Sequence, residues 1–321
     1  MLKTTIKLMA LLVLAFSLTA CKLPRTSITL NSDAEDYIGA GKKYSYNNTN
    51  AVIRVIPTGN RVSVGIDGDE GWWASFQLPS GYTDLQPGSY GNLTRYPFHD
   101  PAVGGLSWSG EGRGCNTLTG WFVIEKAIYE DGQLTELKLN FEQYCDGDIG
   151  ALHGEVVWYA NDKSLPRGPV NPAPANLWQP EPGLLPETDK LVYLDSRPDD
   201  GSGAGSQYLY TGDNDTFIVS ESNGYLTVAV DGWHSDFKPM YTLTRLEPGY
   251  YGDLQRFPFH NPAKGGLSWS GNGIGCNELK GWFVIDSVTY QNNVLTEVEL
   301  RFEQYCDYLE SPLRGVVRWH Q

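Results

Sequence analysis

The residues best suited to chemistry stand in two similar blocks of the chain that are rich in Pro and Gly. The first block spans residues 95–116 and the second spans residues 256–277. Each offers a guanidinium, an imidazole, an indole and an amide, groups that can bind anions, exchange protons, stack on sugar rings and form hydrogen bonds. The ligand-binding candidates in these blocks are Arg95, His99, Trp108, Asn116, Arg256, His260, Trp269 and Asn277.

Each of these candidates also has an ordinary structural role. A loop arginine commonly pairs with a carboxylate or with loop carbonyls through its fixed fork of donors. A loop histidine is more often a hydrogen-bonded structural group than a ligand or an acid-base catalyst. Trp108 and Trp269 can either present a flat face to a sugar or lie buried in a core, and the sequence does not decide between these alternatives.

Two glutamates complete the set of candidates. Glu142 and Glu303 are each followed four residues later by an aspartate, Asp146 and Asp307. Such a pair could hydrolyse a glycosidic bond with a separation of about 5 Å or more, or bind Ca²⁺ through hard oxygens. Solvated charges on a strand and a turn are the ordinary alternative. We expect no cofactor, with Ca²⁺ left open.

No motif of a common catalytic class is complete in this chain. The stretch Gly105-Leu106-Ser107-Trp108-Ser109 lacks the last glycine of a serine-hydrolase elbow. There is no His-Glu-x-x-His zinc motif and no Gly-Lys-Ser/Thr phosphate loop. We therefore expect a binding protein, with a glycan-cleaving enzyme that uses Glu142 and Glu303 as the less favoured alternative.

The elements that must position these residues are strands. In residues 137–145, Leu137, Leu139 and Phe141 alternate with polar residues and share a face with Gln143 and Cys145. A buried amide needs partners, so we expect Gln143 to tie a loop to the sheet. No helical period is sustained over three turns, and these patterns predict an all-β protein with antiparallel, jelly-roll-like β-sandwiches.

The sandwich unit occurs twice in the chain. Residues 88–158 align without a gap with residues 249–319, and 42 of these 71 positions are identical. Two copies of this length indicate tandem domains rather than a solenoid. We expect a signal peptide at residues 1–20, a tether at 21–30, one β-sandwich at 31–160 and the second at 191–321.

The linker between the two domains is rich in proline. Residues 161–190 hold 7 of the 19 prolines in the chain. Proline at this density favours extended polyproline II, so the sequence predicts a semi-rigid spacer between separable domains.

Four cysteines belong to the repeated unit. Cys115 and Cys145 have the same separation as Cys276 and Cys306. Four cysteines allow three pairings, but a duplicated unit most simply carries its own bridge, which predicts the pairs Cys115–Cys145 and Cys276–Cys306. Each bridge closes a loop of about 30 residues, and the chain-entropy model gives it roughly 3 to 4 kcal/mol of stability.

The first 20 residues have the pattern of a secretory signal peptide, with two lysines before an apolar stretch at 8–18. This stretch ends in Leu18-Thr19-Ala20-Cys21, which resembles the lipobox of bacterial lipoproteins. The resemblance implies cleavage before Cys21 and a diacylglycerol on its sulfur, which would anchor the chain in a membrane. Because Lys22 rather than Asp follows, it also implies outer-membrane sorting in a Gram-negative cell.

The charge of the chain narrows the choice of partner. There are 24 basic and 38 acidic side chains, a formal net charge of −14, which makes nucleic acid an unsuitable partner. We expect a lipid-anchored, non-catalytic envelope protein with two similar modules that bind a carbohydrate. The main alternative is a structural or adhesion protein of the envelope that binds another protein.

Overall fold

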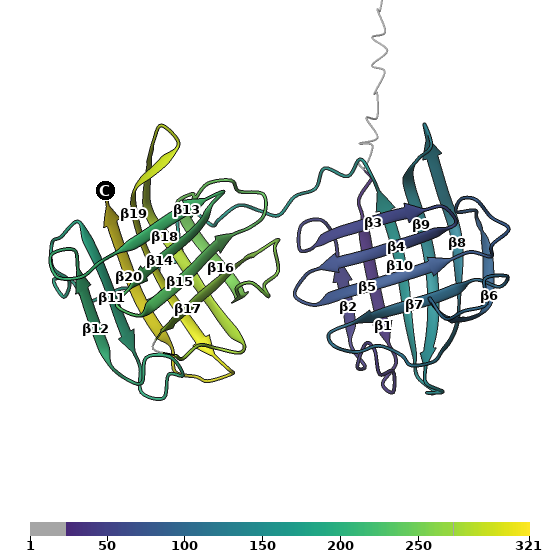
Figure 1. The fold of residues 1–321 in the computed structure, drawn as a ribbon, viewed down its shortest axis with the longest axis horizontal. Helices are drawn as coiled ribbons and strands as arrows, with labels where there is room; N and C mark the ends of the chain where they lie inside the picture. The colour runs from purple at the N-terminus through teal and green to yellow at the C-terminus, as the bar shows by residue number, and fades with distance from the viewer. Residues whose placement is uncertain (1–23, 272) are drawn as a thin grey trace, which may run out of the picture.

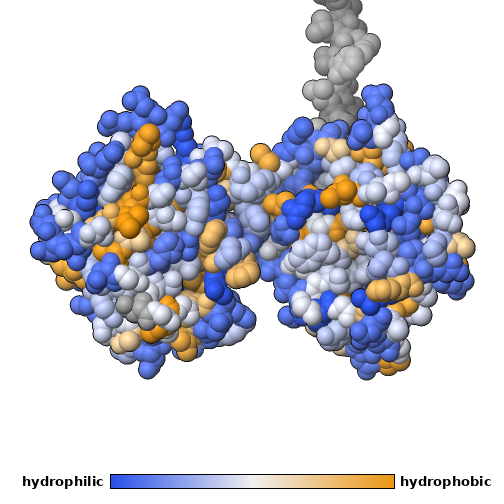
Figure 2. Space-filling view, in the orientation of Figure 1, coloured by the Kyte–Doolittle hydropathy of each residue, from blue (hydrophilic) through white to orange (hydrophobic). Residues whose placement is uncertain are grey.

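The computed structural model describes residues 24–271 and 273–321, which form two β-domains without an α-helix (Figure 1). Two tandem antiparallel β-domains, as the sequence predicts, are therefore confirmed. In the described part of the chain, no helix is long and apolar enough to cross a membrane. Cys21 and the expected signal peptide lie outside the described residues. Figure 2 shows a largely hydrophilic surface, with hydrophobic residues in small separate patches.

Each domain contains ten strands. In repeat 1 these are β1 (Ser27–Ser32), β2 (Lys43–Tyr46), β3 (Val52–Thr58), β4 (Arg61–Asp67), β5 (Gly71–Gln77), β6 (Gly88–Arg95), β7 (Gly105–Gly110), β8 (Leu118–Glu130), β9 (Gln133–Cys145) and β10 (Ala151–Tyr159). In repeat 2 they are β11 (Lys190–Ser196), β12 (Gln207–Thr211), β13 (Ile218–Ser222), β14 (Tyr225–Val230), β15 (Trp233–Pro239), β16 (Gly249–Arg256), β17 (Gly265–Gly271), β18 (Leu279–Gln291), β19 (Val294–Cys306) and β20 (Leu313–His320).

The ten strands of each repeat form one continuous sheet that folds onto itself. The order in repeat 1 is β2-β1-β10-β9-β8-β6-β7-β5-β4-β3, and repeat 2 has the same order ten strands later. Neighbours are antiparallel except the pairs β6–β7 and β16–β17, which are parallel. The two edge strands β2 and β3 follow each other in the chain with only residues 47–51 between them, so the ends of the sheet come close together.

The core lies between the two halves of the folded sheet. The Phe141 ring from β9 stacks on Trp108 from β7, with ring centres 4.8 Å apart, and lies 5.4 Å from Phe76 of β5. Repeat 2 reproduces this cluster, with ring centres of Phe302 and Trp269 5.0 Å apart. The alternation predicted for residues 137–145 is confirmed, because these apolar side chains are buried along β9.

Strands β8 and β9 form a long hairpin. Its turn consists of Asp131 and Gly132, which have φ angles of 50° and 75°. A two-residue turn with positive φ at both positions matches the right-handed twist of the paired strands. Asn292 and Asn293 form the corresponding turn of repeat 2, with φ angles of 51° and 68°.

The structure differs from two expectations, one about the chain before repeat 1 and one about the linker. Residues 27–30, expected as part of the tether, form the first part of β1 and pair with β10. The linker, expected as a semi-rigid spacer between separable domains, is attached to repeat 2: its Val170 exchanges backbone hydrogen bonds with Tyr250 of β16, and its later residues pack on repeat 2. Extended proline-rich chain exposes its carbonyls, and arginines of repeat 2 bind them.

The repeats also contact each other directly through the turn between β4 and β5. Asp69 accepts hydrogen bonds from the Asn261 amide and the Lys264 ammonium group, both at 2.9 Å. The backbone oxygen of Asp69 accepts a third hydrogen bond from Gln255 at 3.2 Å. Asp100, Val103 and Thr94 replace these donors in repeat 1, so only repeat 2 carries the set of donors that binds Asp69.

Candidate functional site

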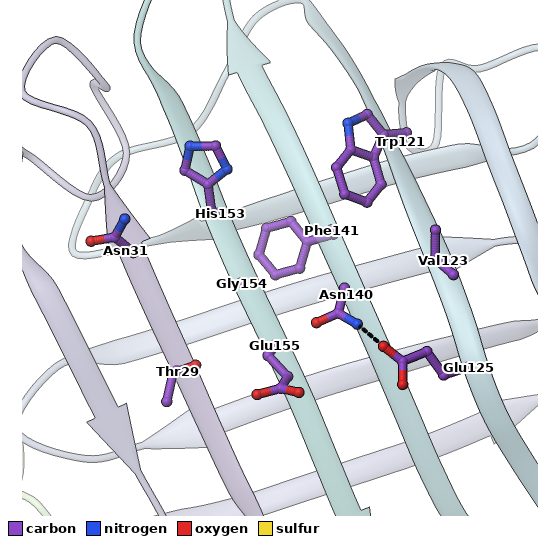
Figure 3. Close-up of a pocket in the computed structure, with 10 residues that line it drawn as sticks. All are labelled: Thr29, Asn31, Trp121, Val123, Glu125, Asn140, Phe141, His153, Gly154 and Glu155. Carbon is purple, nitrogen blue, oxygen red and sulfur yellow. Dashed lines mark hydrogen bonds between the residues drawn. The ribbon is translucent and has the colours of Figure 1, made fainter.

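The outer face of repeat 1 carries an open groove across β1, β10, β9 and β8. Its volume is about 540 Å³. Figure 3 shows the Trp121 indole on one side and His153 on the other, with the Phe141 ring between them and polar side chains below. The lining residues are Thr29, Asn31, Trp121, Val123, Glu125, Asn140, Phe141, His153, Gly154 and Glu155.

A chain of hydrogen bonds holds the indole and the imidazole in place. Trp121 Nε1 donates to Glu142 Oε1 at 3.0 Å, and His153 Nδ1 lies 3.1 Å from Glu142 Oε2. His153 Nε2 lies 3.4 Å from Asp33 Oδ2. Trp121 keeps 38% of its surface exposed, so its ring face is fixed in orientation and open to solvent.

Carboxylates outnumber cations around this groove. Asp33, Glu125, Glu142 and Glu155 line or border it, and Lys138 pairs with Glu125 at 2.7 Å and with Glu155 at 3.7 Å. The Lys138 ammonium group holds the pKa of Glu125 below its usual value. A backbone hydrogen bond from Ala151, with His153 adding to it, likewise lowers the pKa of Asp33. Glu125 and Asp33 are therefore ionised hydrogen-bond acceptors at neutral pH.

The same face of repeat 2 is covered by the linker. We call linker residues 178–188 the strap. Arg301 Nη1 donates to the Trp178 carbonyl at 2.8 Å, and the Arg314 guanidinium lies over the Trp178 ring, 5.8 Å from its centre. Arg318 Nη1 donates to the carbonyls of Pro186 and Thr188 at 3.1 and 3.3 Å.

The three arginines that hold the strap are specific to repeat 2. Their counterparts in repeat 1, 161 residues earlier, are Asn140, His153 and Val157. The Arg301 guanidinium lies 6.0 Å from the ring centre of Trp282, whose exposure is only 8%. Trp282 is the counterpart of Trp121, so the two repeats differ in whether this indole is covered or open.

The arginines of the predicted blocks have the structural role considered above. Arg95 Nη1 donates to the carbonyl of Asn116 at 3.2 Å and its guanidinium lies over the Phe98 ring. Repeat 2 reproduces this contact between Arg256 and Asn277, at 3.1 Å. The structure thus brings each Arg–Asn pair together within its own repeat.

The histidines of these blocks pack inside their own loops. His99 stacks on Tyr96 with ring centres 5.4 Å apart, and it contacts Gly105, where a Cβ atom would lie only 2.5 Å from the imidazole. His260 stacks on Phe257 in the same way, at 5.4 Å. Burial lowers the pKa of His260. Because the ring is partly buried and stacked in its own loop, we assign His260 a structural role.

The interpretation of Trp108 and Trp269 as sugar platforms is wrong. Their exposed fractions are 1% and 0%, because both rings stack on the central phenylalanine of their core. The buried amide of Gln143 binds the backbone of Trp108, accepting from its N–H and donating to its carbonyl, both at 2.9 Å. Gln304 binds Trp269 in the same way. Both amides find partners as predicted, but on strand β7 or β17 rather than on a loop.

The acidic pairs do not act together on one ligand. Asp146 accepts hydrogen bonds from the backbone N–H groups of Asn116 and Thr117, at 3.2 and 2.6 Å, which lowers its pKa. Asp146 therefore orders the loop after the cysteine. The prediction that Glu303 contacts a ligand is wrong. Glu303 is only 8% exposed, and its carboxylate accepts a hydrogen bond from Arg314 at 2.6 Å beneath the strap. Glu142 alone borders an open groove.

Both predicted cysteine pairs lie at disulfide distance. The Cα atoms of Cys115 and Cys145 are 5.0 Å apart, and those of Cys276 and Cys306 are 4.9 Å apart. Each pair connects the loop that precedes β8 or β18 to the last residue of β9 or β19. Among the residues that the structure describes, no three His, Cys, Asp or Glu side chains are grouped to hold a metal ion.

Sequence reasoning missed Trp121 and His153 as site residues. The alternation in residues 121–124 contains the signal, because Phe122 points into the core and Trp121 must then lie on the solvent face beside Val123. A large aromatic residue on the outer face of a strand is the kind of exposed group that marks binding surfaces.

Comparison with protein-family models, with curated proteins and with solved structures gives no match.

Proposed function

We propose that the protein is a lipid-anchored, non-catalytic protein of the bacterial envelope that binds a glycan in the groove of repeat 1. The lipobox resemblance at Cys21 supports the anchor. One observation carries the choice of surface: Trp121 is 38% exposed while its counterpart Trp282 is 8% exposed. An aromatic face among well-placed polar groups is the usual composition of a small-ligand site.

The chemistry of the groove supports a glycan. The apolar face of a sugar ring can stack on the Trp121 indole, and its hydroxyl groups can donate to Glu125, Glu155 and Asn140, which line the same groove. The excess of carboxylates favours neutral or amine-bearing sugars over anionic ones, because like charges repel in a partly buried site. Asp146 accepts hydrogen bonds from the backbone of its own loop, so it does not form a catalytic pair with Glu142. The proposal is therefore one of binding without catalysis.

The two repeats therefore have different roles in this proposal. Arg301 and Arg318 of repeat 2 donate to carbonyl oxygens of the strap, and a carbonyl-rich peptide suits such donors. Arg314 adds its guanidinium over the Trp178 ring. Repeat 1 has Asn140, His153 and Val157 at these positions, so it lacks the guanidinium groups that hold the strap. We expect one glycan site per chain instead of the two equal sites that the duplication suggests.

A glycan array of neutral, amine-bearing and acidic oligosaccharides tests this proposal with the mature protein and its Trp121→Ala variant. We expect binding to neutral or amine-bearing glycans, and a loss of at least tenfold in affinity when the indole is removed. Trp73→Ala is the matched control, because Trp73 is 57% exposed on β5 and does not line this groove. Absence of glycan binding, together with capture of one specific envelope protein that depends on Trp121, would favour the protein-binding alternative.

A further inference from the structure

A second cavity lies where the two repeats meet. It has a volume of about 740 Å³, within the usual range of about 300–1,000 Å³ for small-ligand sites, which often form at domain junctions. Repeat 1 contributes Asp69 and Glu111, and repeat 2 supplies the other lining residues. The contacts of Asp69 with Asn261 and Lys264 fix the two walls relative to each other.

Two exposed aromatic rings line this cleft, and a cationic side chain lies over each ring. Phe259 and Tyr308 are both 74% exposed. The Arg256 guanidinium lies 5.3 Å from the ring centre of Phe259, and the Lys280 ammonium group lies 5.8 Å from that of Tyr308. The cleft therefore presents flat apolar faces next to positive charge.

Two cations that line the cleft, Arg256 and Lys280, have no counter-ion within residues 24–271 and 273–321. In the part of the chain that the structure describes, neither Arg256 nor Lys280 has a carboxylate within ion-pair distance, and Arg256 donates to the Asn277 carbonyl at 3.1 Å. Asp69 is already paired with Lys264 at 2.9 Å.

The carboxylates that line the cleft have partners of their own, apart from one. Glu111 accepts from the backbone N–H of Gly71 at 2.9 Å, and the Tyr308 hydroxyl binds Glu278, which raises the pKa of that hydroxyl. Glu310 is exposed to solvent and is the remaining carboxylate. Among the described residues, Glu111, Glu278 and Glu310 have no cationic partner, so the cleft as a whole has no excess of positive charge. A carboxylate ligand is favoured there only by direct contact with Arg256 and Lys280.

The backbone conformation of Tyr308 indicates a functional role for this ring. Tyr308 has a φ angle of 65°, in the left-handed region where a bulky side chain is strained, and its counterpart in repeat 1 is Gly147, with φ 86°. Strained residues of this kind concentrate at functional sites. Lys280 likewise replaces Thr119 of repeat 1, so both groups of this cation-aromatic pair are specific to the cleft.

We propose that the cleft between the repeats binds a ring-bearing carboxylate, as in a uronic acid residue of an acidic glycan. The sugar ring packs on Tyr308 or Phe259, and its carboxylate binds Arg256 and Lys280. This site differs in place and in charge from the groove of repeat 1, and it does not depend on a glycan binding there.

Isothermal titration of the mature protein with trigalacturonic acid, and with the neutral galactotriose as matched probe, tests this site. We expect binding of the acidic probe alone. Lys280→Thr and Tyr308→Gly introduce the residues of repeat 1 and keep the fold, and each should weaken binding at least tenfold. Trp121→Ala should leave this binding unchanged, which separates the cleft from the groove.

Lys126→Thr is the control for loss of a positive charge, because Lys126 is exposed on β8 and does not line the cleft. It should bind trigalacturonic acid as the unaltered protein does. The proposal is overturned if millimolar trigalacturonic acid does not bind, if galactotriose binds equally well, or if Lys280→Thr and Tyr308→Gly bind as tightly as Lys126→Thr does.

Discussion

Replacing Gln143 with leucine should destabilise repeat 1 strongly, because this amide takes the place of a missing neighbour strand. β6 pairs with β7 only at Gly105 and Leu106, so the backbone of Trp108 has no strand on that side. Gln143 supplies both hydrogen bonds instead, each 2.9 Å long. Leucine has a similar volume but leaves the N–H and the carbonyl of Trp108 buried and unpaired.

The expected loss follows from the two orphaned groups. A buried backbone group without a partner costs about 1–3 kcal/mol, so Gln143→Leu should lower the free energy of unfolding by about 3 kcal/mol. For a domain of this size, this loss corresponds to a fall of roughly 10 °C in Tm. Urea denaturation followed by tryptophan fluorescence measures the first quantity, and differential scanning calorimetry measures the second.

The matched control is Gln133→Leu, the same substitution at an exposed position of the same strand. Its effect should stay within about 0.5 kcal/mol, as is usual for surface substitutions. The reasoning is refuted if Gln143→Leu costs less than about 1 kcal/mol, or no more than Gln133→Leu. Gln304→Leu should reproduce the loss in repeat 2, where the same two bonds are made.

Two further predictions concern the bridges and pH. Replacing Cys115 and Cys145 together with alanine should lower the free energy of unfolding of repeat 1 by about 3.5 kcal/mol, because the bridge closes a loop with a sequence separation of 30; an unchanged urea midpoint would contradict it. Burial depresses the folded-state pKa of His260 below its usual value of 6.5, so the unfolded chain binds this proton more readily and stability falls as pH drops below 6.5. Urea unfolding at pH 7.5 and 5.5 should show this fall in the unaltered protein and a smaller one in His260→Gln, and equal falls would refute the assignment.

The strands and the repeat could be predicted because they depend on local pattern. Alternation along residues 137–145 places Gln143 and Cys145 on the inner face, and the structure has both there. The tight turn at Asp131 and Gly132 also follows from residue type. The duplication predicts the cysteine pairs, since each copy carries its own bridge.

The groove could not be predicted because its exposure depends on residues far away in the chain. Trp121 and Trp282 are the same residue in nearly identical sequence surroundings. Whether the indole is exposed depends on the residue at position 140 or 301 of the next strand. In repeat 2 it also depends on the strap, where Arg301 binds the carbonyl of Trp178, which lies 123 positions earlier in the chain. Trp108 failed as a candidate for a similar reason, since the ring that covers it, Phe141, comes from another strand.

The central claim is that repeat 1 binds a glycan because its indole is uncovered. Asn140→Arg gives repeat 1 the residue that lies against Trp282 in repeat 2, so it should cover Trp121 without removing it. Titration of the unaltered protein and of this variant with the best-binding neutral glycan tests the claim most directly. The account predicts binding by the former and an affinity at least tenfold weaker in the variant; equal affinities, or no binding by either protein, would contradict it.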